Sequence, residues 1–392
     1  MDINQEILRR CQSHFDDVVA IRRDIHRHPE TGFDVERTAA IASDALKHLG
    51  FEVRENIGRT GVVSDLNIPG AKRRIALRAD MDALPMQELG NPEYKSIVDG
   101  KAHMCGHDSH TAMLIGAARV ISEMRDRLKA NVRFIFQPNE ENLPGGAPAM
   151  IRDGALDGVD EIFGLHVWPQ LPTGNIGICS GPALGQPDVF EIIINGVGGH
   201  AALPNETVDP ILIGAQFISN LQSIVARNID PLRSAVISVT KFHSGETHNV
   251  IPQTAEITGT VRTFEKDIQR MIRNKLKNML AGLCSAHGAS FQFDYTDGYP
   301  VTFNHAVSVE KALAAAKHVV GEEKLQFPIT PVLGGEDFAY YSQEIPGCFI
   351  FLGIRNPEKN IVYMCHDPRF DIDEDAMSLG MALHATLALS FE

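Results

Sequence analysis

Hydrophobic residues in the first half of the chain recur in two alternating patterns. Helical spacing of apolar residues runs through residues 7–28, which Pro29 follows, and through residues 35–49, which Gly50 follows. Shorter apolar runs have the character of buried strands and cover residues 51–53, 61–66, 74–78, 132–137 and 161–168. Helices and strands that alternate in this way commonly build a parallel sheet wrapped by helices. We therefore predict an α/β domain with a mostly parallel central sheet flanked by helices.

The pattern changes after Gly181-Pro182. Strand, helix, strand, strand, helix and strand follow one another at residues 190–195, 209–229, 235–242, 255–264, 267–287 and 290–295. This order predicts a four-stranded antiparallel sheet with two helices on one face. The first pattern returns near Gly298 and continues to a final helix at residues 374–389. We predict one α/β domain made of residues 1–184 and 299–392, interrupted by an inserted α+β domain of residues 185–298.

Composition and charge exclude several classes of protein. The 392 residues are 44% hydrophobic and 22% charged, which is typical of globular proteins and not of disordered or fibrous ones. The formal charge of −14 comes without a basic cluster, which argues against nucleic acid or an anionic membrane as a partner. The chain shows neither a long apolar run nor the start of a signal peptide, and its six cysteines have no paired spacing. A cytoplasmic location with reduced thiols is the expectation.

The segment richest in chemistry is His103-Met104-Cys105-Gly106-His107-Asp108-Ser109-His110. If Cys105 and His107 lie on extended backbone, their side chains point to the same side and can bind one metal ion. The following helix would then begin after His107, with Asp108 or Ser109 as its N-cap. The alternative is a structural cysteine beside capping residues, because two ligands alone do not make a metal site.

Two pairs of acidic residues follow predicted strands. Asp80 and Asp82 lie at the carboxyl end of the strand at residues 74–78, where open α/β sheets place their chemistry. Glu140 and Glu141 come just after the strand at residues 132–137. Adjacent extended residues point to opposite sides, so one glutamate can coordinate a metal while the other handles a proton.

Two separate histidines, His166 within a strand and His366 at a junction between strand and loop, complete the candidates. Spacing alone does not join these residues into a site. In order and position, the motifs resemble the metal-dependent aminoacylase and amidohydrolase branch of the zinc carboxypeptidase-like peptidase family. That branch includes hippurate hydrolase, the indole-3-acetyl-amino acid hydrolases and N-acetyl-diaminopimelate deacetylase. The motifs span almost the whole chain: Asp-x-Asp-Ala-Leu-Pro, His-x-Cys-Gly-His-Asp-x-His, Gln-Pro-x-Glu-Glu, Gly-Leu-His, Gly-Gly-His-Ala-Ala-x-Pro, Gly-Gly-Glu-Asp-Phe and a late His-x-Pro.

The resemblance implies a catalytic domain that holds two divalent metal ions per subunit. The expected ligands are Cys105, His107, Glu141, His166 and His366. Glu140 matches the general base, Asp82 matches an aspartate that orients a ligand histidine, and Asp80 is expected to assist without being a ligand. Such ligands suit Zn²⁺ or Mn²⁺, and also Co²⁺ or Ni²⁺, so ligand type does not fix the metal.

The inserted domain resembles the lid and dimerisation domain of the same family. His200 matches a histidine that donates to the developing oxyanion, often in the partner subunit's site. Asn249 and Arg262 match positions that hold the free carboxylate of the substrate. The resemblance therefore implies a homodimer, or a higher homo-oligomer, that hydrolyses the amide bond of small N-acyl amino acids.

Three alternatives stay open at this point. A dipeptidase or carboxypeptidase would use the same two-metal centre on short peptides. A thiol enzyme would use Cys105 as a nucleophile activated by His107, without any metal. A binding protein with a structural zinc site would need four protein ligands and no free base, whereas Glu140 lies directly beside a candidate ligand.

Overall fold

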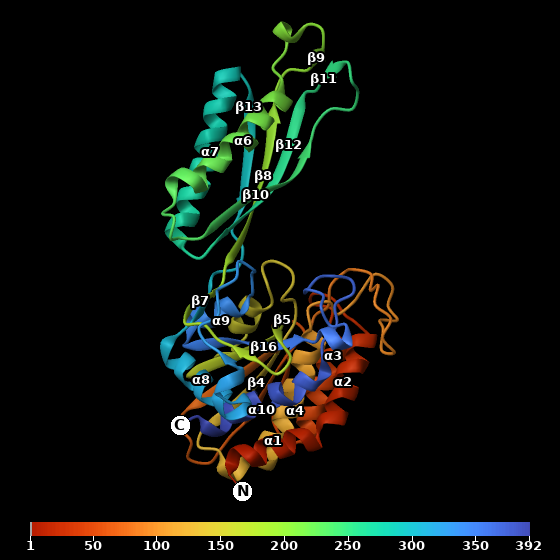
Figure 1. The fold of residues 1–392 in the computed structure, drawn as a ribbon, viewed down its shortest axis with the longest axis vertical. Helices are drawn as coiled ribbons and strands as arrows, with labels where there is room; N and C mark the ends of the chain where they lie inside the picture. Colours follow the sequence, from red (N-terminus) through yellow and green to blue (C-terminus); the bar gives the residue numbers. More distant parts are fainter. Residues whose placement is uncertain (1) are drawn as a thin grey trace. The chain divides into compact units, whose positions relative to one another are not determined.

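The computed structural model describes residues 2–392 and divides into two compact units. The first unit contains the chain up to Ala183 together with Thr302–Pro331 and Glu336–Glu392, and the second contains Leu184–Val301 and Val332–Gly335. The second unit is therefore an insertion in the first. Figure 1 shows the elements of each unit along the chain, which is coloured from red to blue. Within residues 2–392, no helix combines the length and the apolar character needed to cross a membrane.

The first unit is built on an eight-stranded mixed sheet. Its strand order is β1-β2-β4-β3-β5-β16-β6-β15, and the four central strands from β4 to β16 are parallel. The parallel centre is buried on both faces, which explains why its strands are continuous apolar runs in the sequence. This sheet confirms the predicted α/β class. The bounds are β1 (Glu52–Ile57), β2 (Gly61–Leu66), β3 (Arg74–Asp80), β4 (Asn131–Gln137), β5 (Glu161–Pro172), β6 (Ile176–Gly177), β15 (Leu325–Gln326) and β16 (Gly347–Arg355).

Helices cover the sheet of this unit, and most of them share one hydrophobic core with it (Figure 1). Helix α4 lies at the centre of that core, is buried along nearly its whole length and packs against α2 and α10. The helices are α1 (Ile3–Ser13), α2 (Phe15–Arg27), α3 (Glu36–His48), α4 (His107–Glu123), α5 (Ala147–Arg152), α8 (Ala306–Val320), α9 (Phe338–Glu344) and α10 (Met377–Ser390), and a small sheet pairs β7 (Gly181–Leu184) with β14 (Thr302–Asn304).

The single helix predicted for residues 7–28 is wrong, because α1 and α2 are separate helices. The chain leaves the helical conformation at His14, whose φ and ψ are −100° and 1°. Polar side chains stabilise this break. Ser13 Oγ donates to the main-chain oxygen of Arg10 at 2.8 Å, and His14 Nε2 lies 2.7 Å from a carboxylate oxygen of Glu123. The Ser13 bond is local and competes with helix continuation, whereas the His14 contact joins residues 109 positions apart, and apolar spacing alone reveals neither.

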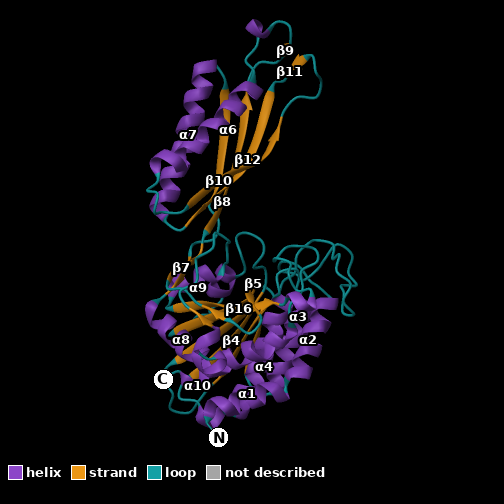
Figure 2. Cartoon of the chain, in the orientation of Figure 1, coloured by secondary structure: helices purple, strands orange, loops and turns teal. Residues whose placement is uncertain are grey.

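The second unit is a four-stranded antiparallel sheet with two helices on one face, as predicted (Figure 2). The apolar side chains of alternate strand positions pack against the two helices in a separate core. A short two-stranded sheet of β9 and β11 extends from it. The order is β10-β12-β8-β13, with bounds β8 (Gln186–Asn195), β9 (Gly199–His200), α6 (Pro210–Asn228), β10 (Ala235–His243), β11 (Val250–Ile251), β12 (Thr254–Thr263), α7 (Lys266–His287) and β13 (Ser290–Thr296).

Candidate metal centre

The loop that carries Cys105 enters α4 through a left-handed glycine. Gly106 has a φ of +95°, and a Cβ atom at this position would lie 2.3 Å from Val167 Cγ2. Only glycine therefore fits this turn. The helix begins at His107, with Gly106 as its cap residue. The prediction that Cys105 to His107 is extended is wrong, because the chain turns at Gly106.

The predicted N-cap is wrong for the same reason. Asp108 and Ser109 lie inside the first turn of α4, and Ser109 Oγ donates back to the main-chain oxygen of Gly106 at 2.6 Å. The sharp turn still brings the two candidate ligands together. Ligand atoms of Cys105, His107 and His166 lie within 4.8 Å of one another, and Cys105 Sγ is 3.5 Å from His166 Nε2.

Two further groups share residues with this one. Ligand atoms of Cys105, Glu141 and His366 lie within 4.8 Å of one another, and so do those of His107, Glu140 and Glu141. The structure therefore gathers all five predicted metal ligands and the predicted base in one place. They come from the loop before α4, the start of α4, the loop after β4, the middle of β5 and the loop after β16.

Hydrogen bonds fix the tautomers of two of these histidines. His107 Nδ1 donates to the main-chain oxygen of Asp82 at 2.7 Å, and His166 Nδ1 donates to the main-chain oxygen of Val167 at 2.7 Å. Each ring then presents an unprotonated Nε2 to the centre, which is the state that a metal ligand needs.

Two buried atoms at the centre lack hydrogen-bond partners among the described residues. They are His107 Nε2 and Glu141 Oε1, although the latter lies 3.3 Å from His366 Nε2. Buried polar atoms are rarely left without a partner unless an ion or water completes them. A thiol, three imidazoles and a carboxylate form a donor set that transition metals bind well. The residues present therefore fit divalent metal ions.

Asp82 contacts the candidate ligand His107, which it was expected to orient. Its main-chain oxygen accepts from His107 Nδ1. The carboxylate lies 3.6 Å from His107 Nδ1 and accepts hydrogen bonds from the main-chain nitrogens of Glu140 at 2.9 Å and Glu141 at 3.2 Å. Asp82 thus fixes the turn that carries the two glutamates.

The two glutamates have different electrostatic surroundings. Burial, together with the carboxylates of Glu336 and Glu141, raises the pKa of Glu140 well above its usual range. Burial also acts on Glu141, but His366 and His107 outweigh it and lower the pKa of that carboxyl. Adjacent carboxyl groups with opposite shifts are typical of sites that separate a proton-handling group from a charged one.

His366 reaches the centre from an unusual backbone conformation. Its φ is +69°, in the left-handed region, and its main-chain nitrogen donates to the main-chain oxygen of Met104 at 2.7 Å. This bond ties the loop after β16 to the residue that precedes Cys105. The His366 side chain is 55% exposed, so the centre opens to solvent on this side.

Sequence reasoning missed a layer of polar residues behind the centre. Asp80, which was expected to assist, accepts a hydrogen bond from His110 Nδ1 at 2.6 Å. It also contacts Arg78, a fully buried residue to which no role was assigned. The available signals were a charged residue inside an apolar strand and three motifs, Gly-Gly-Glu-Asp-Phe, the last histidine of His-x-Cys-Gly-His-Asp-x-His and the glutamine of Gln-Pro-x-Glu-Glu. The missed residues are Arg78, His110, Gln137, Glu336 and Asp337.

The three site residues predicted on the second unit do not lie together. His200 lies on β9 and Asn249 directly precedes β11, and both are exposed. The main-chain nitrogen of Ala201 donates to the main-chain oxygen of Asn249 at 3.0 Å. Arg262 is half-buried near the far end of β12. Eight strand positions separate it from Thr254, where β12 begins beside β11, which corresponds to ~26 Å.

The fold and the metal-binding cluster together define a metallohydrolase. The family model for peptidase family M20/M25/M40 matches residues 76–390, so the chain belongs to this family, as the motifs predicted. An N-acyl-L-amino acid amidohydrolase of Geobacillus stearothermophilus is 44% identical over 77% of this chain and 81% of its own. The chain thus lies in the amidohydrolase branch of the family.

Two further relatives cover nearly the whole chain. Thermostable carboxypeptidase 2 of Saccharolobus solfataricus is 39% identical over 100% of this chain and 99% of its own. The crystal structure of the Bacillus subtilis YXEP protein, described as a dinuclear metal binding peptidase from the M20 family, has a TM-score of 0.83 and 36% identity. It covers 96% of this chain and 98% of that one. The names of these relatives agree on hydrolysis and differ in substrate, and the YXEP protein is the one described as binding metal.

Proposed function

We propose that this protein hydrolyses the amide bond of N-acyl amino acids and releases a carboxylic acid and a free amino acid. The observation that carries the proposal is Glu140, a buried carboxyl group that lies directly beside the candidate ligand Glu141. A structural metal site needs no such group. The similarity to an N-acyl-L-amino acid amidohydrolase supports the substrate class.

The residues that would hold two divalent ions, Zn²⁺ or Mn²⁺, are Cys105, His107, Glu141, His166 and His366. When bound, such ions lower the pKa of a water molecule and polarise a carbonyl group. Glu140 accepts the proton of the attacking water and then delivers it to the departing amine nitrogen. Asp82 keeps Glu140 in place through the main-chain nitrogen of that residue.

The second unit supplies the remaining contacts in this proposal. His200 donates to the developing oxyanion, and Asn249 and Arg262 bind the free carboxylate of the substrate. Because Arg262 lies ~26 Å along the unit from the start of β12 near His200 and Asn249, one copy of the unit does not present all three to one substrate. We therefore propose that a partner subunit in a homodimer supplies His200 together with Asn249, which lies beside it.

A second candidate function is cleavage of dipeptides or of carboxyl-terminal residues by the same centre. The carboxypeptidase relative, at 39% identity over the whole chain, favours it. A panel of hippurate, several N-acetyl amino acids and several dipeptides separates the two. The assay is run before chelation, after chelation, and after Zn²⁺ or Mn²⁺ is restored. We expect the acyl amino acids to be the better substrates, with activity lost on chelation and recovered with metal.

The base assignment is tested by Glu140→Gln. We expect kcat to fall about 10²- to 10⁴-fold, because the variant lacks a proton acceptor, while the metal content stays unchanged. Glu161→Gln is the matched control, since Glu161 is also a buried glutamate of the first unit but lies at the start of β5 and pairs with Lys311. If the Glu140→Gln variant stayed active, Glu140 would not be the general base. Activity that survives chelation but is lost on alkylation would make Cys105 the nucleophile.

The shared site is tested by mixing two inactive variants, Glu140→Gln and His200→Ala. If His200 acts in the partner's site, a mixed dimer contains one complete site, with Glu140 from one subunit and His200 from the other. Activity should then reappear after the subunits exchange. If each subunit uses its own His200, every site in the mixture lacks one group and activity stays absent.

A further inference from the structure

The polar layer behind the metal centre is organised around Arg78. Its side chain is fully buried in β3, and it donates four hydrogen bonds or ion pairs. Burial opposes its charge, but the surrounding carboxylates outweigh burial and keep the pKa of the guanidinium well above its usual range. The contacts are Nε to Gln137 Oε1 at 3.0 Å, Nη1 to Asp80 Oδ2 at 2.6 Å, and Nη2 to Asp337 Oδ1 at 2.9 Å and Glu336 Oε1 at 3.1 Å.

One branch of these contacts closes the loop that carries Glu140. Gln137 ends β4 just before the loop, and Ala147 begins α5 just after it. Asp337 accepts hydrogen bonds from both ends, from Gln137 Nε2 at 2.7 Å and from the main-chain nitrogen of Ala147 at 3.0 Å. Arg78 holds Asp337 and Gln137 at the same time, so it fixes both ends of residues 138–146.

The other branch leads to the strand that carries a candidate ligand. Asp80 binds Arg78 through Oδ2 and accepts from His110 Nδ1 through Oδ1. His110 is therefore protonated on Nδ1, and its Nε2 accepts from the main-chain nitrogen of Val167 at 2.9 Å. Val167 follows His166 directly. Three hydrogen bonds in series, through the side chains of Asp80 and His110, thus connect Arg78 to the backbone beside His166.

We propose that Arg78 is a positioning residue, which sets the place of the general-base loop and of the His166 strand through these two hydrogen-bond chains. A planar guanidinium can make all these contacts at once because its donors are fixed in a fork. A lysine keeps the positive charge but has a single nitrogen. Arg78→Lys therefore separates the geometric role from simple charge compensation.

The inference rests on Glu140 acting as the proposed base, and its test compares Arg78→Lys with Arg133→Lys. Arg133 is a suitable control because it is a buried arginine on the neighbouring strand β4. It binds Asp65 through two nitrogens at 2.8 Å and donates to two main-chain oxygens. Its partners lie outside the metal centre. Both variants therefore lose the forked donors of a buried guanidinium. Only Arg78→Lys also loses the contacts that position the Glu140 loop and the His166 strand.

We expect kcat of metal-loaded Arg78→Lys to fall about 10- to 100-fold, because small displacements of a base are costly. KM should change less than about threefold, and Arg133→Lys should keep kcat within about twofold. Amide hydrogen exchange gives a second measurement that needs no substrate. Exchange in residues 138–147 should accelerate at least about tenfold in Arg78→Lys relative to Arg133→Lys.

Equal kcat and equal exchange in the two variants would overturn the proposal, and so would a loss of activity that bound metal fully restores. If Arg78→Lys does not fold, Asp337→Ala replaces it, because this change removes the acceptor for both ends of the loop while leaving Arg78 in place. It should give the same two effects. If wild-type protein hydrolyses no substrate in the panel, the proposed function fails, whereas hydrogen exchange still decides the role of Arg78.

Discussion

Two arginines of the first unit are completely buried, and each is surrounded by three carboxylates, yet their surroundings differ. Two partners of Arg22 have side chains that are 22% and 16% exposed, whereas no partner of Arg78 exceeds 3%. The partners of Arg22 are Asp108, Asp371 and Glu374, and those of Arg78 are Asp80, Glu336 and Asp337. The same combination of charges is therefore partly exposed to water around Arg22, whereas around Arg78 it is buried behind the metal centre.

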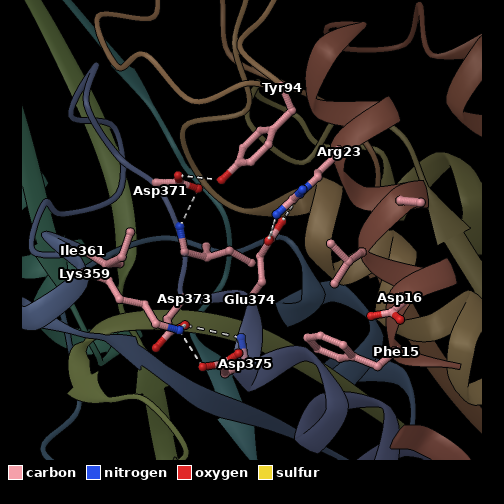
Figure 3. Close-up of a pocket in the computed structure, with 13 residues that line it drawn as sticks. Phe15, Asp16, Arg23, Tyr94, Lys359, Ile361, Asp371, Asp373, Glu374 and Asp375 are labelled. Atoms are coloured by element: carbon pink, nitrogen blue, oxygen red, sulfur yellow. Dashed lines mark hydrogen bonds and ion pairs between the residues drawn. The ribbon is translucent and has the colours of Figure 1, made fainter. Parts of the chain in front are cut away.

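The exposed side of the Arg22 cluster is a pocket of 620 Å³ (Figure 3). Asp371 and Glu374 line it, and each is already paired, Asp371 with the hydroxyl of Tyr94 at 2.7 Å and Glu374 with Arg23 at 2.6 Å. Water can replace a lost partner on this side. Behind Arg78 water has no such access, so geometry there depends on the protein alone. A buried arginine is structural in the first setting and can position a reacting group in the second.

The largest effect is expected for Arg22→Met. The variant removes the arginine partner of Asp108, which is fully buried and keeps its hydrogen bond with His26, and breaking a buried ion pair in this way costs about 3–5 kcal/mol of unfolding free energy. Urea unfolding of the metal-loaded protein measures it. The folded variant should retain kcat within about threefold, in contrast to Arg78→Lys. A loss of unfolding free energy below about 1 kcal/mol would mean that Arg22 is not an essential buried partner of Asp108. A large drop in kcat would mean that Arg22, like Arg78, affects the reacting groups.

The parts of this structure that sequence could predict are those with local or ordered signals. Apolar spacing identified the α/β sheet and the inserted antiparallel sheet, because the pattern of apolar residues in each strand matches the faces that the strand buries. The order of motifs along the chain identified the candidate ligands, which the fold brings within 4.8 Å in groups. Neither result required knowledge of how distant segments pack.

The parts that could not be predicted depend on distant partners or on one backbone angle. Arg78 binds Asp337, which lies 259 positions away, and nothing in the sequence connects them. The start of α4 at His107 follows from the left-handed conformation of Gly106, a position where any side chain would collide with Val167. The role of the Asp82 carboxylate was likewise set by main-chain nitrogens of a loop after another strand.

A smaller, pH-dependent effect is expected for His26→Gln, which tests the inner side of the Arg22 cluster. Burial opposes the charge of His26, but its hydrogen bonds to Asp108 and Glu88 outweigh burial and raise its pKa. The folded state thus binds the proton more tightly than the unfolded state. The resulting stability is fully present below the unfolded pKa, about 6.5, and is lost as pH rises through the higher folded value.

The substitution should therefore cost about 1.5–3 kcal/mol at pH 5.5, as expected for a charged hydrogen bond, and about 1 kcal/mol at pH 9. Urea unfolding of the wild type and the variant at both pH values measures the difference, with His48→Gln as an exposed control. A cost that stays constant or grows with pH would mean that His26 is neutral in the folded protein. The inner side of the cluster would then resemble a neutral hydrogen-bond network.

The smallest effect is expected at the outer edge of the pocket, for Lys359→Met. Lys359 is 48% exposed and pairs with Asp373 and Asp375, and Asp373 keeps a hydrogen bond from Asn356 Nδ2 at 2.7 Å when the lysine is removed. Exposed pairs contribute about 0–1 kcal/mol, and salt screens them. Urea unfolding at low salt and at about 1 M salt should show a small cost that disappears as salt rises. A cost above about 2 kcal/mol that persists in salt would place this edge with the buried clusters, because only pairs withdrawn from water resist screening.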